Sequence, residues 1–131
     1  MPDYVLDTHA CVFALASPKK LGRSARRALE SVESGASIGW VPAAVAAEIV
    51  LLHELGRTAI GLPQLEAAFE EASSLRFLPL DHRQLREFAA HSKIRDPFDR
   101  LIVSAARVVN ARLISRDEDL GDSNLVHVVW S

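Results

Sequence analysis

Short apolar runs alternate along this chain with longer segments whose apolar residues recur at helical spacing. The runs typical of β-strands occupy residues 4–6, 36–40, 76–80, 112–115 and 125–130. The segments typical of helices occupy residues 9–16, 24–33, 42 to about 55, 63 to about 74, a stretch beginning after 81, and 97 to about 110. Strands separated by helices favour right-handed crossovers between parallel strands. The pattern therefore predicts a three-layer α/β/α fold with a central, mostly parallel five-stranded sheet.

Residues that start or stop helices support these boundaries. Pro42 opens one helical segment and Gly56 closes it, as expected for a proline in the first turn and a glycine just past the last one. Asp81 is expected to cap the helix that follows it. Gln84 lies three residues further on, as in a capping box.

The composition limits the class of protein. A chain of 131 residues suits a single domain, spanning residues 1–131. Apolar residues make up 49% and charged residues 24%, which indicates a globular chain rather than a disordered one. The net charge of −2 does not by itself indicate a nucleic-acid binder. The single cysteine, Cys11, excludes a disulfide framework and a cysteine-rich zinc site.

The location of the protein is also constrained. No apolar run reaches the roughly 20 residues of a membrane span. The first residues lack the basic region and apolar stretch of a signal peptide. We therefore expect a cytoplasmic protein with no membrane association.

Acidic residues stand at the carboxyl ends of two predicted strands, where parallel α/β folds bind their ligands. Asp7 ends the first strand, and Asp117 closely follows the fourth. If those strands are neighbours, both side chains are expected at the same sheet edge. The alternative is that Asp7 caps the next helix and Asp117 caps a turn.

Glu48 is the one charged residue between positions 41 and 52. A helix that is apolar nearly all round is expected to be buried. A lone carboxylate in such a helix costs several kcal/mol unless a cation or hydrogen-bond donors compensate it. Glu48 is therefore a candidate ligand. The alternative places it on a narrow exposed stripe.

Two further acids open the helix predicted from residue 97. Asp96 precedes Pro97, so it is expected to cap this helix. Asp99 falls in the first turn, where the helix dipole favours a negative charge. Capping alone can explain the pair, but the apolar residues that follow indicate a partly buried helix start, which also suits a functional site.

Carboxylates that converge without histidine or cysteine favour Mg²⁺ or Mn²⁺ over zinc. The matching reaction is phosphodiester hydrolysis, in which bound metal activates water and stabilises charge on the phosphate and the leaving oxygen. No GxSxG, P-loop, HExxH or GxGxxG motif offers a different chemistry.

Four segments of the chain resemble PIN-domain proteins, specifically the VapC-like ribonuclease toxins of type II toxin–antitoxin pairs. Residues 4–9, YVLDTH, resemble the opening strand of that family. Residues 96–102, DPFDRLI, resemble the DPFDR signature of one of its branches. Residues 113–117, LISRD, resemble its T/S-R-D segment, and residues 128–130 are similar to its usual ending. The resemblance covers essentially the whole chain, in order.

The resemblance implies a Mg²⁺- or Mn²⁺-dependent endoribonuclease on a PIN fold. The acids that match the family's catalytic and metal-binding positions are Asp7, Glu48, Asp99 and Asp117. Asp96 is an extra acid of the DPFDR branch, and is either a further ligand, an orienting group or a helix cap. Thr8 and Ser115 match hydroxyl positions expected to orient carboxylates or water, with ordinary capping as the alternative.

The chain departs from the family pattern near these acids. Pro42, Val45 and Ala47 stand where the family often has serines and an aromatic residue, and Ser115 replaces the commoner threonine. None of these departures removes a carboxylate. The metal ligands implied by the resemblance are therefore all present.

The family also implies three partners: an RNA substrate, a cognate antitoxin and a second copy in a homodimer. Taking the four acids from the 17 in the chain leaves 13 against 15 bases, which makes the surround mildly basic. Arg100 and Arg116 adjoin the proposed site in sequence and are the candidate RNA contacts; a solvated or salt-bridged arginine is the alternative. The leucine-rich residues 49–62 resemble the groove that binds the family's antitoxin tail, with core packing as the alternative.

Two other functions stay open at this point. A non-catalytic PIN-like module would bind RNA or protein without cleaving it, although the presence of all four acids argues against this. A phosphatase-like α/β enzyme would use Asp7 as its nucleophile. The sequence Asp7-Thr8-His9 lacks the second acid of the DxD element that such an enzyme needs.

Overall fold

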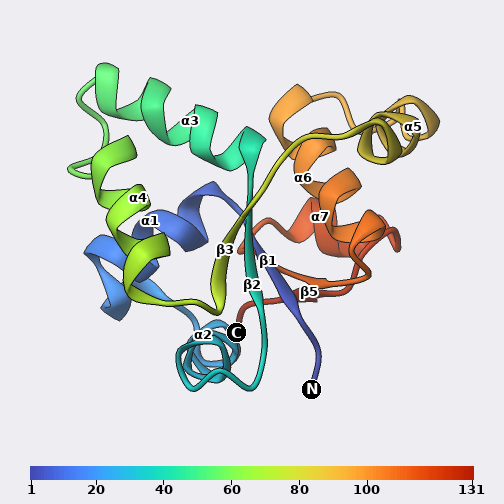
Figure 1. Cartoon of the computed structure of the whole chain (residues 1–131). Helices are drawn as coiled ribbons and strands as arrows, with labels where there is room; N and C mark the ends of the chain where they lie inside the picture. The colour runs from blue at the N-terminus through green and yellow to red at the C-terminus, as the bar shows by residue number, and fades with distance from the viewer.

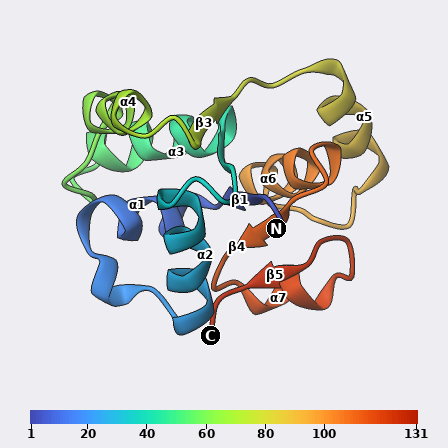
Figure 2. The same ribbon diagram turned by 60° about the horizontal axis from the view of Figure 1, so that its bottom comes forward.

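Five parallel strands run through the centre of the molecule, with helices on both sides of them (Figures 1 and 2). The computed structural model describes residues 1–131. The strands are β1 (Tyr4–Leu6), β2 (Gly39–Pro42), β3 (Leu75–Leu78), β4 (Arg112–Ile114) and β5 (Val128–Val129). The helices are α1 (Thr8–Ala16), the 3-10 helix η1 (Pro18–Lys20), α2 (Arg23–Glu33), α3 (Ala43–Glu54), α4 (Leu62–Glu71), α5 (His82–Ala90), α6 (Pro97–Val108) and α7 (Glu118–Asp122). The predicted α/β/α fold is confirmed.

The sheet has the strand order β3-β2-β1-β4-β5, and all four pairings are parallel. The first strand in the chain therefore lies in the middle. Its three residues are at most 7% exposed, as expected for a strand covered on both faces. In Figure 1, β1 and β2 run upward and lead into α1 and α3 at the same edge of the sheet. Residues that follow the parallel strands meet at this edge.

Several predicted strand boundaries need correction. The second strand begins at Gly39 rather than residue 36, because the preceding residues form other hydrogen bonds. The Ser37 amide donates to the Ser31 carbonyl, and the Ile38 amide donates to the Asp3 carboxylate at 2.9 Å. These bonds close the end of α2, so pairing starts only afterwards. β5 is likewise shorter than predicted.

The cap of α5 is confirmed, but its capping box is not formed. The Asp81 carboxylate accepts a hydrogen bond from the Gln84 amide at 3.0 Å, as predicted. The Gln84 side chain is buried and donates to the Pro79 carbonyl at 2.8 Å instead of reaching back. A reciprocal bond of this kind occurs at α4, where Gln64 Oε1 accepts from the Gly61 amide at 2.8 Å.

The buried apolar side chains form one core cluster of 23 residues, contributed by both helices and strands. A bilayer-spanning helix is absent, since every helix is too short or too polar for one. Neither α7 nor η1 is predicted from the sequence, because segments this short show no hydrophobic period.

We predict that Gly22→Ala destabilises the fold. The Ala25 amide donates to the Trp130 carbonyl at 2.9 Å, which draws the end of the chain against the start of α2. A Cβ at Gly22 would collide with that carbonyl. Overpacking of this kind costs roughly 1–3 kcal/mol, measurable by urea unfolding. Gly121→Ala is the control, because its Cβ would lie 3.7 Å from Val128, in ordinary contact. Equal stability of the two variants would contradict the steric explanation.

Candidate active site

The pairing of β1 with β4 brings the first two acids to one place. Leu6 lies opposite Ile114 in this register, and the Asp7 amide donates to the Ile114 carbonyl at 3.1 Å. Asp7 and Ser115 therefore leave the sheet side by side. Asp117 follows two residues later, so it reaches the same edge as Asp7.

Asp7 is both a helix cap and a buried acid. Its Oδ1 accepts a hydrogen bond from the Ala10 amide at 2.8 Å, at the start of α1. The residue is 9% exposed. Burial raises the pKa of Asp7, and the charge of Asp117 adds to this, while hydrogen bonds from Ser115 and Ala10 act in the opposite direction. The cap uses one carboxylate oxygen and fixes the direction of the other.

Ser115 links two of the acids. It is fully buried, and its Oγ accepts a hydrogen bond from the Asp117 amide at 3.1 Å. Its side chain also acts on the neighbouring Asp7 carboxyl group and lowers the pKa of Asp7. Asp117 in turn caps α7, accepting from the Asp119 amide at 2.9 Å. The predicted capping alternatives for Asp7 and Asp117 are thus observed, together with their convergence.

Glu48 reaches the site from α3. The expectation that this helix is buried all round is wrong: Val45 and Ile49 are fully buried, but Ala47 is exposed and Glu48 is half-buried. The reason is that α3 packs on α1 and α6 with one side and leaves the other to solvent. The buried Thr8 hydroxyl donates a hydrogen bond to Glu48 Oε1. A hydroxyl donor thus supplies part of the compensation that the carboxylate needs.

Asp96 and Asp99 open α6. Asp96 caps the helix, since its Oδ1 accepts from the Asp99 amide at 3.0 Å. Burial raises the pKa of Asp99 to about 6, and the charges of Asp96, Asp117, Glu48 and Asp7 contribute to the rise in that order. The four acids therefore lie close enough to Asp99 to act on its carboxyl group, after burial, which is the main cause of the rise.

The four acids at predicted ligand positions line one cavity of about 410 Å³, the carboxylate cavity. Its lining residues are Asp7, Thr8, His9, Glu48, Asp99, Ile102, Arg116 and Asp117. As the side chains stand, no three of them are close enough together to form a coordination shell. Holding a cation would take rotation of the carboxylates toward one another. Asp96 lines a neighbouring cleft with Asp99 and Asp117 instead.

Two lining residues are absent from the sequence-based set. His9 lies two positions after Asp7, and Ile102 lies three positions after Asp99 on the same helix. Residues spaced by about three positions share a helix face. Helical spacing from Asp99 would therefore have found Ile102.

The two candidate RNA contacts are placed differently. Arg116 lines the carboxylate cavity, and its guanidinium lies 5.1 Å from the centroid of the Phe13 ring. Arg100 lies 4.1 Å from the ring centroid of Phe88 and donates to the Phe88 carbonyl at 2.7 Å. These contacts pack α6 against α5 and account for Arg100 without RNA. A role for Arg100 in RNA binding stays a prediction.

The raised pKa of Asp99 predicts a pH effect on stability in the presence of a chelator. The carboxyl holds its proton more tightly when folded, with a pKa of about 6 against 3.8. Its favourable contribution is therefore complete below pH 3.8 and is lost as pH rises through about 6. Asp99→Asn cannot ionise, so its Tm should exceed that of the parent near pH 7 and approach it near pH 4, as measured by circular dichroism in EDTA. Asp122→Asn, which removes an exposed acid of the same chain, is the control for the effect of one lost charge. A pH-independent difference for Asp99→Asn would contradict the raised pKa.

This chain was compared with protein families, curated sequences and solved structures. The family model described as PIN domain matches residues 4–123. A search of curated protein sequences gave no match. Among solved structures, the chain is similar to one in VapBC2 from Rickettsia felis bound to a DNA fragment from their promoter, with a TM-score of 0.71, 18% identity, and 98% of each chain covered. DNA-bound VapBC from Salmonella typhimurium gives a TM-score of 0.61 at 16% identity, covering 98% of this chain and 97% of the other. FitAcB from Neisseria gonorrhoeae gives 0.63 at 20% identity, with 95% of each covered. The structural similarities show a shared fold, and the family match shows that this chain belongs to the PIN domain family.

Proposed function

We propose that this protein is a divalent-metal-dependent endoribonuclease, the VapC-like toxin of a toxin–antitoxin pair, and that residues 1–131 form its single domain. The observation that carries the proposal is the convergence of Asp7, Glu48, Asp99 and Asp117 on one cavity from four separate segments. Membership of the PIN domain family supports it. So does the fold shared with VapBC and FitAcB structures.

The donor set fits a hard divalent cation. All four acids offer carboxylate oxygens, no cysteine lines the cavity, and His9 is its single histidine, so the donor set is mainly oxygen and suits Mg²⁺ or Mn²⁺ better than zinc. Burial raises the pKa of Asp99, and the charges of four acids add to this rise; a cation among the acids would also relieve that second, repulsive contribution. Asp96 uses Oδ1 to cap α6, so its other oxygen is available for a ligand or orienting role. When bound, the ion would lower the pKa of a water and stabilise charge on the phosphate and the leaving oxygen.

Groups around the carboxylates hold them in place for this task. The Ala10 amide and the Ser115 hydroxyl fix Asp7, and the Thr8 hydroxyl fixes Glu48. Partners of this kind orient metal ligands and raise affinity. Hydrolysis would join a water oxygen to phosphorus as the bond to a ribose oxygen breaks, and that oxygen would take a proton. Arg116 supplies a cation at the same cavity for an RNA phosphate.

We also propose that an antitoxin covers the leucine-rich residues 49–62. Leu51, Leu55 and Leu62 are 46%, 66% and 43% exposed, whereas Ile49 and Ile60 are buried. The segment therefore contributes side chains to the core and also exposes apolar surface. An amphipathic helix of the antitoxin could pack on that surface. A homodimer formed by symmetric pairing and a cytoplasmic location, where RNA is available, complete the proposal.

Asp7→Asn should abolish RNA cleavage and relieve growth inhibition. The amide oxygen of asparagine can still cap α1, but the side chain loses its charge, so the fold should survive while metal binding fails. Sequencing of RNA 5′ ends after induced expression measures cleavage, and circular dichroism checks the fold. We expect at least a 100-fold loss of cleavage for Asp7→Asn and, as a second variant, Asp99→Asn.

The matched control is Asp122→Asn, an exposed acid of α7 that should keep full activity. Full cleavage by Asp7→Asn would refute the assignment. Wild-type protein that holds RNA without binding a divalent ion, as measured by isothermal titration calorimetry, would instead favour the non-catalytic module.

Thr8→Val should weaken Mn²⁺ binding while leaving the fold intact. Valine keeps the shape of threonine but removes the donor that fixes Glu48. Loss of an orienting partner typically costs 10- to 100-fold in metal affinity. Thr8→Ser retains the hydroxyl and should bind Mn²⁺ nearly as well as the parent in a calorimetric titration. Equal affinities for valine and serine would show that the hydroxyl does not orient Glu48.

A further inference from the structure

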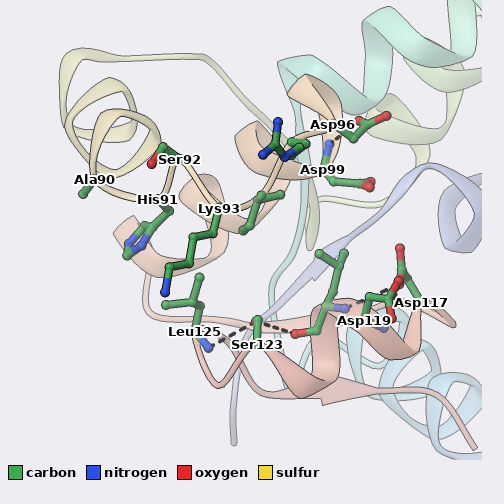
Figure 3. Close-up of a pocket in the computed structure, with 13 residues that line it drawn as sticks. Ala90, His91, Ser92, Lys93, Asp96, Asp99, Asp117, Asp119, Ser123 and Leu125 are labelled. Atoms are coloured by element: carbon green, nitrogen blue, oxygen red, sulfur yellow. Dashed lines mark hydrogen bonds between the residues drawn. The ribbon is translucent and has the colours of Figure 1, made fainter.

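A second and larger cleft, of about 730 Å³, opens beside the carboxylate cavity (Figure 3). We name it the loop cleft, because residues 90–96 between α5 and α6 form one of its walls. Residues 119–125, from α7 and the segment after it, contribute the other wall. Asp99 and Asp117 line both the loop cleft and the carboxylate cavity. A group bound at these two acids therefore has free space on two sides.

Basic and acidic side chains both line the loop cleft, and Lys93 and Arg95 share one wall with Asp96. Figure 3 shows Lys93 pointing into the cleft beside His91, Asp96 and Asp99 together at the start of α6, and Asp117 and Asp119 on the α7 side. Lys93 is exposed and takes part in none of the ion pairs of the molecule. Its side chain makes no hydrogen bond either, so no contact within the protein accounts for its charge.

A hydrogen-bonded network holds the cleft in shape. The Glu87 carboxylate accepts from Arg107 Nε at 2.9 Å and lies 2.9 Å from His91 Nε2. Arg107 also donates to the Leu125 carbonyl at 2.7 Å. The end of α5 is thereby tied to α6 and to the opposite wall of the cleft. Lys93 follows His91 by two residues, so its loop is anchored next to it.

We propose that the loop cleft holds the nucleoside next to the scissile phosphodiester of an RNA strand, with Lys93 contacting the following phosphate. This subsite rests on the proposed function. A phosphodiester placed at Asp99 and Asp117 would direct one of the two nucleosides that it joins into the carboxylate cavity and the other into the loop cleft. A volume of about 730 Å³ lies within the range of roughly 300–1,000 Å³ typical of ligand sites.

The chemistry of the walls decides how the nucleotide lies. A phosphate is repelled by the Asp119 carboxylate and attracted by the Lys93 ammonium. A carboxylate accepts hydrogen bonds from base amino groups and ribose hydroxyls. Ile94, which is half-buried, is the apolar residue of the Lys93 loop that lines the cleft. The base and ribose therefore lie beside Ile94 facing Asp119, and the phosphate lies at Lys93.

RNA binding by an uncleaving protein tests this subsite. The probe is a fluorescein-labelled 12-nucleotide RNA of random sequence, and anisotropy gives its Kd against KCl concentration in the Asp7→Asn background. Adding Lys93→Ala should raise the Kd about 5- to 10-fold and reduce the log–log salt slope by about 0.7, the effect of one phosphate contact in a single strand. Lys93→Arg should restore binding. Lys19→Ala, at an exposed lysine that lines neither space, should change nothing.

Mn²⁺ affinity, measured with Asp7 intact, distinguishes an effect on the RNA subsite from an effect on metal binding in the carboxylate cavity. Lys93→Ala should bind Mn²⁺ as the wild type does. A lower Mn²⁺ affinity would show that Lys93 affects the carboxylate cavity, and this would overturn the subsite. RNA affinity and salt slope unchanged by Lys93→Ala would also overturn it, and would leave the proposed nuclease intact if Asp7→Asn still abolishes cleavage. Wild-type protein that neither binds Mn²⁺ nor cleaves RNA would remove the proposed function, and the subsite with it.

Discussion

Repulsion among carboxylates that the backbone holds at one sheet edge is the constraint on which the candidate site depends. Burial is the main cause that raises the pKa of Asp99 to about 6, and the charges of four neighbouring acids add to this rise. The acids cannot move apart freely, because main-chain structure fixes them. Asp7 is set by the pairing of β1 with β4, and Asp117 by the residues that follow β4.

Helix starts partly offset this repulsion. Asp7, Asp96 and Asp117 are the N-caps of α1, α6 and α7, and Asp99 lies in the first turn of α6. The positive ends of three helix dipoles therefore face the acids. Capping and ligand binding are thus compatible roles for one carboxylate, since the oxygen bound to the backbone fixes the direction of its partner.

The charged surroundings of the acids divide into two spaces. Arg116, stacked on Phe13, stands at the carboxylate cavity, and Lys93 stands at the loop cleft. Arg100, by contrast, is committed to Phe88. Adjacency to an acid in the sequence therefore does not show which arginine lines the site. Residues next to an acid on a helix or strand point away from it as often as toward it.

The fold class could be predicted from the amino-acid sequence alone, and so could the candidate acids of the site. Apolar runs and helical periods are local properties, so the alternation of strands and helices could be recognised without coordinates. Local cap signals placed Asp81 and Asp96 correctly at their helices. The end of each strand, the open side of α3 and the direction of the Gln84 side chain became clear only from the folded structure. The folded structure also decided which acids share a cavity and where Lys93 stands. These features depend on contacts between residues far apart in the chain, and a pattern read along the chain does not contain such distances.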